Sequence, residues 1–470
     1  MADEIPANED VSQFGRLMRQ HRLRIGLTQR ELADFSTISV RAIRDLEQGK
    51  ATRPRQDTVR LIAEGLRLGP RARVALEVAA NRGLAGRALK EYYDSAPPAP
   101  PAALDPIVGR ASETAVITDE LGSGTERLVT IVGLGGTGKT RLALNVAHRL
   151  HAQSRMPVLW HAFSGASACY HHSGGIEGMP ALLSACVDEL FGAEVSGGIQ
   201  AFVELVGDRP ALLVADGAGV AAPCPDRLAR LLHDCPEVRV LVTADRPGGV
   251  AGERIFLLAP LETPGTDEEA KAEVFVQVPA VRLFLDLVGK AGPGGAGADR
   301  QTALVADICR SLDGLPLALR AAASWLLVYD LTTLRRCLAA GPAELLDHLS
   351  GAESGSGLRE ALDRCVGRLD PPDRDLLTAL CRRDGGFGLE DVAELTGLSM
   401  PDSGRVVRGL MLYGLVRTSQ EVGRPPFRVL HLVQAVVLTD RRLTAPGMPD
   451  QLPFVRVRRV SHGIREGVMP

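Results

Sequence analysis

The feature that most constrains this sequence is a glycine-rich loop that contains one lysine, GLGGTGKT, at residues 133 to 140. An apolar run, LVTIV, precedes the loop, and RLALNVAHRL follows it with leucine and valine at helical spacing. Lysine is rare in this chain, with 5 lysines against 49 arginines, so Lys139 needs a physical reason. The order of apolar strand, glycine loop and amphipathic helix predicts the start of an α/β unit with a parallel sheet.

The loop has the G-x-x-x-x-G-K-[ST] pattern of a phosphate-binding loop, or P-loop. Its glycines allow backbone amides to converge on phosphate oxygens at the start of a helix. Lys139 then reaches the β- and γ-phosphates, and the Thr140 hydroxyl contacts Mg²⁺. The predicted nucleotide-binding residues of the loop are Gly133, Gly135, Gly136, Thr137, Gly138, Lys139, Thr140 and Arg141.

A second buried strand is expected over ALLVAD, with Asp216 at its end. A P-loop needs such an acid to hold the metal, so Lys139 and Asp216 are the candidate catalytic residues and Thr140 and Asp216 the candidate magnesium site. The alternative is that Asp216 only forms an Asp-Gly turn. Gly217 follows, so no second carboxylate stands beside Asp216 to orient an attacking water, which favours a slow hydrolase or a nucleotide-held switch.

Charge and composition divide the chain into parts. Residues 11 to 90 hold 17 basic against 7 acidic residues, whereas the rest holds 37 against 50. A basic block on an acidic body is typical of a polyanion-binding module attached to another domain. The Pro/Ala segment SAPPAPPAALDP predicts a spacer between them, and beyond about residue 265 helical patterns dominate.

We therefore predict a multidomain protein with an all-α helix-turn-helix domain, an α/β P-loop NTPase domain with a parallel sheet, a helical domain and a winged-helix domain. The expected bounds are 1–94 for the helix-turn-helix domain, 95–105 for the linker, 106–263 for the NTPase domain, 264–350 for the helical domain, 351–445 for the winged helix and 446–470 for a tail.

Two short helices joined by a tight turn are predicted in the basic block. Thr28-Gln-Arg-Glu31 is a capping box that starts the first helix, and Ser39 is the N-cap of the second, which Gly49 ends. This spacing is typical of a helix-turn-helix whose second helix enters the major groove. The alternative is a helical bundle with a solvated arginine face or a protein contact surface. The candidate DNA-binding residues are Gln29, Ser39, Arg41, Arg44, Lys50, Arg53 and Arg55.

Two family resemblances follow from these motifs. The segment GLTQRELADFSTISVRAIRDLEQGKATRPRQDTVRLIAEGL resembles the Xre/Cro family of DNA-binding domains, which implies double-stranded DNA as a partner. The motifs IVGR, GLGGTGKT, TADR and GLPL, in this order, resemble the STAND NTPases of the NB-ARC type, in particular those of bacterial regulators of secondary metabolism. This second resemblance covers roughly residues 106 to 440 and implies ATP or ADP with Mg²⁺ as cofactors.

By the same resemblance, Val108 and Arg110 contact adenine, Arg246 senses the γ-phosphate and Pro316 packs on the adenine. The third-strand motif departs from the family pattern, because Asp245 stands where an arginine is usual and Arg246 comes one residue later. The segment FRVLHLVQAVV resembles the family's histidine motif, yet the alignment puts His431 one residue beyond the histidine position.

The motifs together predict a cytoplasmic transcriptional regulator in which ATP or ADP controls homo-oligomerisation and promoter binding. Two alternatives are a P-loop ATPase with the helix-turn-helix as a docking module, and a constitutive DNA-binding protein with a structural nucleotide. The scattered cysteines predict reduced thiols, the acidic start has no signal-peptide pattern, and no apolar stretch is long enough to predict a membrane span.

Overall fold

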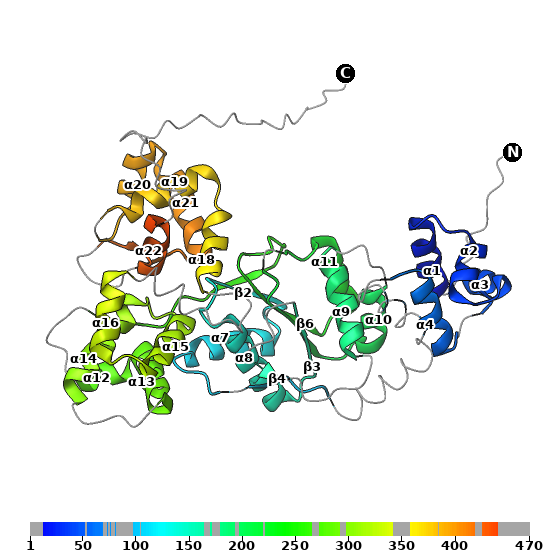
Figure 1. Ribbon diagram of the computed structural model, residues 1–470, viewed down its shortest axis with the longest axis horizontal. Helices are drawn as coiled ribbons and strands as arrows, with labels where there is room; N and C mark the ends of the chain where they lie inside the picture. Colours follow the sequence, from blue (N-terminus) through cyan, green and yellow to red (C-terminus); the bar gives the residue numbers. More distant parts are fainter. Residues whose placement is uncertain are drawn as a thin grey trace, which may run out of the picture. The chain divides into compact units, whose positions relative to one another are not determined.

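The computed structural model describes residues 13–51, 54–68, 73, 76, 80, 97–103, 105–163, 170–171, 179–192, 197–219, 221–265, 272–291, 298–341, 358–383, 385–418 and 425–439. Two compact units are found. One contains residues up to 261 with 278–283 and 353–355, and the other contains the remainder. Figure 1 labels the helices and strands.

The described residues of the N-terminal group include four helices with described bounds. They are α1 (Gln13–Arg24), α2 (Gln29–Ser36), α3 (Val40–Glu47) and α4 (Gln56–Gly65). The predicted capping box is present, because the Thr28 hydroxyl accepts from the Glu31 amide and the Glu31 carboxylate accepts from the Thr28 amide. Ser39 caps α3 as expected. The buried centre of this group is formed by Phe14, Leu17, Met18, Leu32, Ile43, Leu46, Val59 and Ile62.

A five-stranded parallel sheet is the centre of the α/β domain, in the order β3-β5-β6-β2-β7. Its strands are β2 (Leu128–Val132), β3 (Val158–Ala162), β5 (Ala211–Asp216), β6 (Val238–Ala244) and β7 (Arg254–Leu257). Every residue of β2, β5 and β6 is buried. Such largely apolar, fully buried strands are expected in a parallel sheet that is covered on both faces.

Helices cover both faces of this sheet (Figure 1). They are α7 (Ala111–Ser123), α8 (Lys139–Ser154), α9 (Met179–Leu190), α10 (Gly198–Val206) and α11 (Pro225–Asp234). Alternate residues of β5 separate the two layers: Leu212 and Val214 pack with α7 and α8, whereas Leu213 and Ala215 pack with α9, α10 and α11. This alternation follows from the two-residue period of a strand.

Part of the predicted Pro/Ala spacer belongs to the α/β domain. Strand β1 (Ala102–Ala103) pairs antiparallel with β4 (Tyr170–His171). The carbonyl of Pro98 accepts from the Val158 amide at 2.8 Å, and His148 bonds the carbonyl of Pro101. Because proline lacks an amide hydrogen, its carbonyl is the group that such a segment offers for pairing. Residues 97 to 103, which the sequence predicted as part of a spacer between domains, are therefore bonded to the α/β domain.

The second unit is mainly helical, as the sequence predicted beyond residue 265. Its first helices are α12 (Ala272–Gln277), α13 (Pro279–Ala291), α14 (Ala298–Ser311), α15 (Pro316–Ser324), the short 3₁₀ helix η2 (Trp325–Leu327) and α16 (Leu331–Ala340). The first residues of α13 belong to the first unit. Asp330 caps α16 through the Thr333 amide at 2.6 Å.

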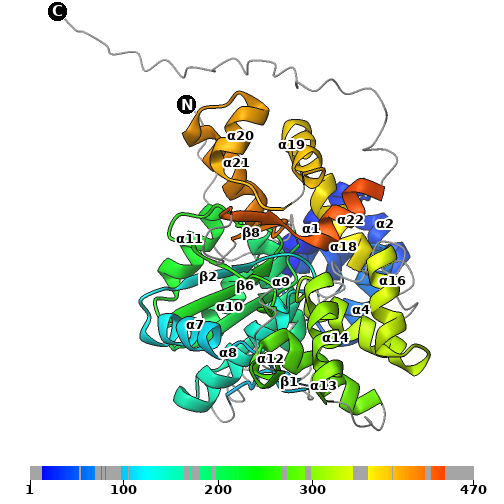
Figure 2. The same cartoon turned by 90° about the vertical axis from the view of Figure 1, so that its left-hand side faces the viewer.

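The C-terminal group has helices followed by a small antiparallel sheet, and Figure 2 shows β8 near α21. The elements are α18 (Leu358–Gly367), α19 (Pro371–Cys381), α20 (Leu389–Thr396), α21 (Met400–Leu412), β8 (Val416–Thr418), β9 (Phe427–Val429) and α22 (His431–Thr439). Phe387 adds an isolated bridge to Phe427. The assignment of residues 351–445 to a winged-helix domain stays a prediction, and the predicted tail lies outside the described residues.

Two further sequence predictions can be compared with the described residues. The seven cysteines among them are free thiols. Within the same ranges, no helix combines the length and the apolar character that a bilayer span requires.

Candidate functional site

The glycine-lysine loop lies between β2 and α8, at the carboxyl edge of the parallel sheet. Gly136 and Gly138 have φ angles of 87° and 97°, which side chains other than glycine rarely adopt. A Cβ atom on Gly133 would lie 2.6 Å from the Leu258 carbonyl oxygen, so this position has no room for a side chain. The backbone geometry therefore requires glycine at three of the four loop glycines.

Lys139 is the first residue of α8, and its ammonium group has three acceptors. Nζ donates to the carbonyl oxygens of Gly133 at 2.6 Å and Leu134 at 3.3 Å, and to Oδ1 of Asp245 at 3.2 Å. The side chains of Lys139 and Asp245 are only 12% and 15% exposed, so solvent screens this ion pair weakly. The loop motif contains no signal for a carboxylate beside the lysine.

Asp216 ends β5 and is fully buried. Its Oδ1 accepts from the hydroxyl of Thr140 at 2.8 Å and from that of Thr243 at 2.7 Å. The Thr243 hydroxyl also accepts from the amide of Gly217. Since oxygen ligands suit Mg²⁺, the Thr140 and Asp216 pair fits the predicted metal chemistry. The sequence analysis did not include Thr243 among the site residues. Its position near the end of a buried strand could have indicated it, because the ends of parallel strands meet at one edge of the sheet.

Arg110 is buried and bonds the loop backbone. Its Nη2 donates to the carbonyl oxygens of Thr137 at 3.3 Å and Ala259 at 2.6 Å, and its Nη1 pairs with Glu113 at 2.8 Å. These bonds join the loop to the segment after β7, so Arg110 supports the shape of the loop. Val108, the other residue predicted to contact adenine, is half-buried. An adenine contact by either residue stays a prediction.

Three further residues predicted to bind the nucleotide, Arg141, Arg246 and Pro316, lie in different parts of the fold. Arg141 is half-buried in the first turn of α8, and Arg246 is exposed two residues after β6. Pro316 is the first residue of α15 in the second unit. Their roles toward a nucleotide stay predictions.

His431 contacts the loop before α15 within the second unit. Its Nδ1 lies 3.3 Å from Oδ1 of Asp313 and 3.2 Å from the carbonyl oxygen of Arg310. The other carboxylate oxygen of Asp313 accepts from the Leu432 amide at 2.8 Å. The start of α22 is thereby bonded to the residue directly before the GLPL motif. This contact was not expected from the sequence.

The basic residues predicted to contact DNA lie on α3 and in the segment after it. Arg41 and Arg44 are exposed on α3, and Lys50 and Arg55 are exposed beyond it. These four positions agree with a surface for phosphates or bases, because each cation reaches solvent. Arg53, the fifth predicted basic contact, lies outside the described residues.

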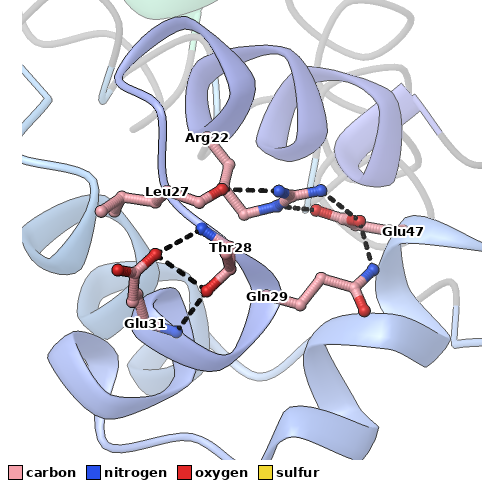
Figure 3. A network of polar contacts seen from close by, with 6 residues as sticks. All are labelled: Arg22, Leu27, Thr28, Gln29, Glu31 and Glu47. Atoms are coloured by element: carbon pink, nitrogen blue, oxygen red, sulfur yellow. Dashed lines mark hydrogen bonds and ion pairs between the residues drawn. The ribbon is translucent and has the colours of Figure 1, made fainter.

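Figure 3 shows a buried polar network that fixes α3 against the first two helices. Arg22 donates to both carboxylate oxygens of Glu47, at 2.7 and 3.0 Å, and to the Leu27 carbonyl oxygen at 2.7 Å. The amide of Gln29, which was predicted to bond a phosphate, donates to Glu47 at 2.7 Å. Gln29 therefore also positions α3. Sequence reasoning missed the Arg22 and Glu47 pair, because 25 residues separate its members.

Comparison with known protein families adds a finding for this group. Residues 13–76 match the family model described as "Helix-turn-helix domain". Residues 13–76 form a helix-turn-helix domain. The predicted fold of the basic block is confirmed. The second helix of the helix-turn-helix is α3. Ser39 is its N-cap, and Arg41 and Arg44 lie on it.

Similar proteins in other organisms extend over more of the chain. A putative HTH-type transcriptional regulator of Mycobacterium tuberculosis (strain ATCC 25618 / H37Rv) is 29% identical over 327 residues, which is 66% of this chain and 33% of the relative. Regulatory protein AfsR of Streptomyces griseus is 28% identical over 435 residues, 89% of this chain and 41% of AfsR. An uncharacterised protein of the same M. tuberculosis strain is 27% identical over 370 residues, covering 74% and 84%.

The chain spans about a third of the length of the mycobacterial regulator and about two fifths of AfsR. Among solved structures, a Signal Transduction ATPase with Numerous Domains (STAND) protein with a tetratricopeptide repeat sensor from Pyrococcus horikoshii matches with a TM-score of 0.29 and 15% identity. That match covers 72% of this chain and 43% of the other. The predicted resemblance to transcriptional regulators with a helix-turn-helix domain is confirmed by the family match and the aligned mycobacterial relative.

Proposed function

We propose that this protein is a cytoplasmic transcriptional regulator whose α/β domain binds ATP or ADP with Mg²⁺, and whose nucleotide state controls binding of double-stranded DNA. One observation carries the nucleotide part of this proposal. At the carboxyl edge of the sheet lie Lys139, Thr140 and Asp216. The Thr140 hydroxyl donates to the Asp216 carboxylate, and the Lys139 ammonium group donates to the Gly133 carbonyl oxygen of the loop. In open parallel sheets, ligands bind at this edge.

The donor set fits a magnesium nucleotide. The loop offers backbone amides at the N-terminus of α8, where the helix dipole favours an anion. Lys139 would bind the terminal phosphates, and the oxygens of Thr140 and Asp216 would hold the metal. Bound Mg²⁺ supplies neutralisation of phosphate charge. Gly217 follows Asp216, so β5 does not continue into a second carboxylate that could orient water, and we infer slow hydrolysis at most.

DNA binding is assigned to the helix-turn-helix domain. The exposed cations Arg41 and Arg44 lie on α3, whose buried side is fixed by Ile43 and Leu46. A helix with this division presents one face to the major groove while the other packs on the domain. We infer phosphate or base contacts for Ser39, Arg41 and Arg44, and backbone contacts for Lys50 and the loop that follows it.

Nucleotide state would act by differential affinity for two arrangements of the protein. One arrangement would form a homo-oligomer that places several helix-turn-helix domains on adjacent half-sites and raises the effective concentration of each. Genes of secondary metabolism are the proposed targets, by resemblance to the regulators with which the STAND motifs are shared.

The test uses the full chain loaded with ADP or with ATP. Sequences that the protein selects from a pool of random double-stranded DNA provide the probe, and sedimentation measures the oligomer. The proposal predicts that exchanging the nucleotide changes both the sedimentation coefficient and the affinity for the selected DNA. Equal values in both nucleotide states would contradict it. Turnover above about one per second would instead favour a true ATPase.

A further inference from the structure

The ion pair between Lys139 and Asp245 places a negative charge at the group that the proposed function assigns to the nucleotide phosphates. An ammonium group has three donor hydrogens, and the two loop carbonyls and the Asp245 carboxylate supply three acceptors. A phosphate oxygen that bonds Lys139 must therefore replace or share one of these partners.

The backbone fixes Asp245 in this place. Its amide donates to the carbonyl oxygen of Gly219 at 2.9 Å, which ties the end of β6 to the segment after β5. The Ala218 amide donates to the carbonyl oxygen of Thr243, two residues before Asp245, also at 2.9 Å. These two bonds hold the backbone around Asp245 at the carboxyl edge of the sheet, and its carboxylate lies 3.2 Å from the ammonium group.

Charge distinguishes the two nucleotides at such a site. A triphosphate carries one more phosphoryl group than a diphosphate, and the P-loop lysine reaches the β- and γ-phosphates. The γ-phosphate would therefore share Lys139 with a carboxylate of the same sign. Because both side chains are largely buried, repulsion between the two anions is screened much less than on an open surface.

We propose that Asp245 acts as a built-in competitor of the γ-phosphate for Lys139, so that the site holds ADP in preference to ATP. The inference rests on the proposed nucleotide binding and adds its selectivity. Displacement of Asp245 from Lys139 is then the step that admits a triphosphate.

The test compares dissociation constants of the full chain, freed of nucleotide, for ADP and for a non-hydrolysable ATP analogue in the presence of Mg²⁺. Asp245→Asn removes the charge and keeps the shape of the side chain. The matched control is Asp208→Asn, because Asp208 is exposed and precedes β5, at the opposite edge of the sheet from Asp216. Asp245→Ala is a second variant.

The measured quantity is the ratio of the triphosphate to the diphosphate dissociation constant within each preparation, so that partial loss of folded protein cancels. We expect a ratio above one in the wild type, a fall of about tenfold in Asp245→Asn and Asp245→Ala, and no change in the control. If the ratio in both variants stays within about twofold of the wild-type ratio, or rises above it, the inference is overturned while the proposed nucleotide binding stands. Failure of the wild type to bind either nucleotide overturns both proposals.

Discussion

The hydroxyl of Thr140 and the carboxylate of Asp216 are joined by a hydrogen bond of 2.8 Å, which connects the first turn of α8 to the end of β5. Both groups supply oxygen atoms, and Asp216 is fully buried. The bond places the two predicted metal-binding residues side by side, although 76 residues separate them in the chain.

The substitution Asp216→Asn tests this relationship. The asparagine side chain would keep an acceptor for Thr140 but lose the charge that favours a divalent cation. We expect the gain in nucleotide affinity on adding Mg²⁺ to fall by about tenfold or more, with little change in affinity when the metal is chelated. Titration calorimetry with and without Mg²⁺ measures both. An equal loss in the two conditions would show that Asp216 only supports the fold.

The buried pair of Arg22 and Glu47 predicts a stability effect in the helix-turn-helix domain. Glu47→Gln leaves the Arg22 guanidinium buried without its carboxylate, so we expect a loss of about 3–5 kcal/mol. The matched control is Glu64→Gln, which removes the carboxylate of exposed pairs with Arg60 and Arg73 and is expected to cost about 1 kcal/mol or less. Hydrogen exchange of the amides in α1 to α4 measures both, and similar losses for the two variants would contradict the assignment.

DNA affinity should depend on the exposed arginines of α3. If Arg41 or Arg44 contacts a phosphate, its substitution by alanine should lower the slope of log affinity against log salt by about one. If it contacts a base, affinity for the selected site should fall by about 1–3 kcal/mol and specificity at one position should relax. The control is Arg60→Ala on α4, an equal change of charge. A uniform small loss in all three variants would indicate long-range attraction alone.

A pH dependence is expected from His21 in α1. Burial lowers the pKa of His21 below its usual 6.5, and Arg24 adds a smaller decrease. The unfolded chain therefore binds the proton more readily, so stability of the domain is fully present above the unfolded pKa and falls as pH decreases through 6.5. His21→Gln should flatten this decrease when hydrogen exchange is followed over about one pH unit on either side of that value. An unchanged profile would assign the effect to other groups.

Local signals in the sequence predicted much of the fold. The capping box at Thr28 and the N-cap at Ser39 fixed both helix starts, since capping involves residues only three apart. The runs LVTIV and ALLVAD predicted buried parallel strands because nearly all their residues are apolar up to the terminal acid of the second run. Strands β3 and β7 were missed, and the exposed ends of β7 explain why its pattern is weak.

Contacts between distant residues were beyond the sequence patterns. The loop motif predicted Lys139 and Thr140, and the run ALLVAD predicted Asp216. Neither Asp245, which contacts the lysine, nor Thr243, which bonds Asp216, could be paired with them from the sequence. Strand order decides these contacts, because β6 lies between β5 and β2 and its last residues therefore lie near both Asp216 and the loop. The apolar runs predicted strands without their order.

The measurement that tests the central claim most directly identifies the nucleotide carried by the protein. Freshly purified wild type and Lys139→Ala are denatured, and the released nucleotide is separated and quantified by chromatography. The account predicts ADP in stoichiometric amount from the wild type and its loss in the variant, because Lys139 is the loop cation proposed to bind the phosphates. A wild type that releases no nucleotide and also fails to bind added ADP or ATP would contradict the account.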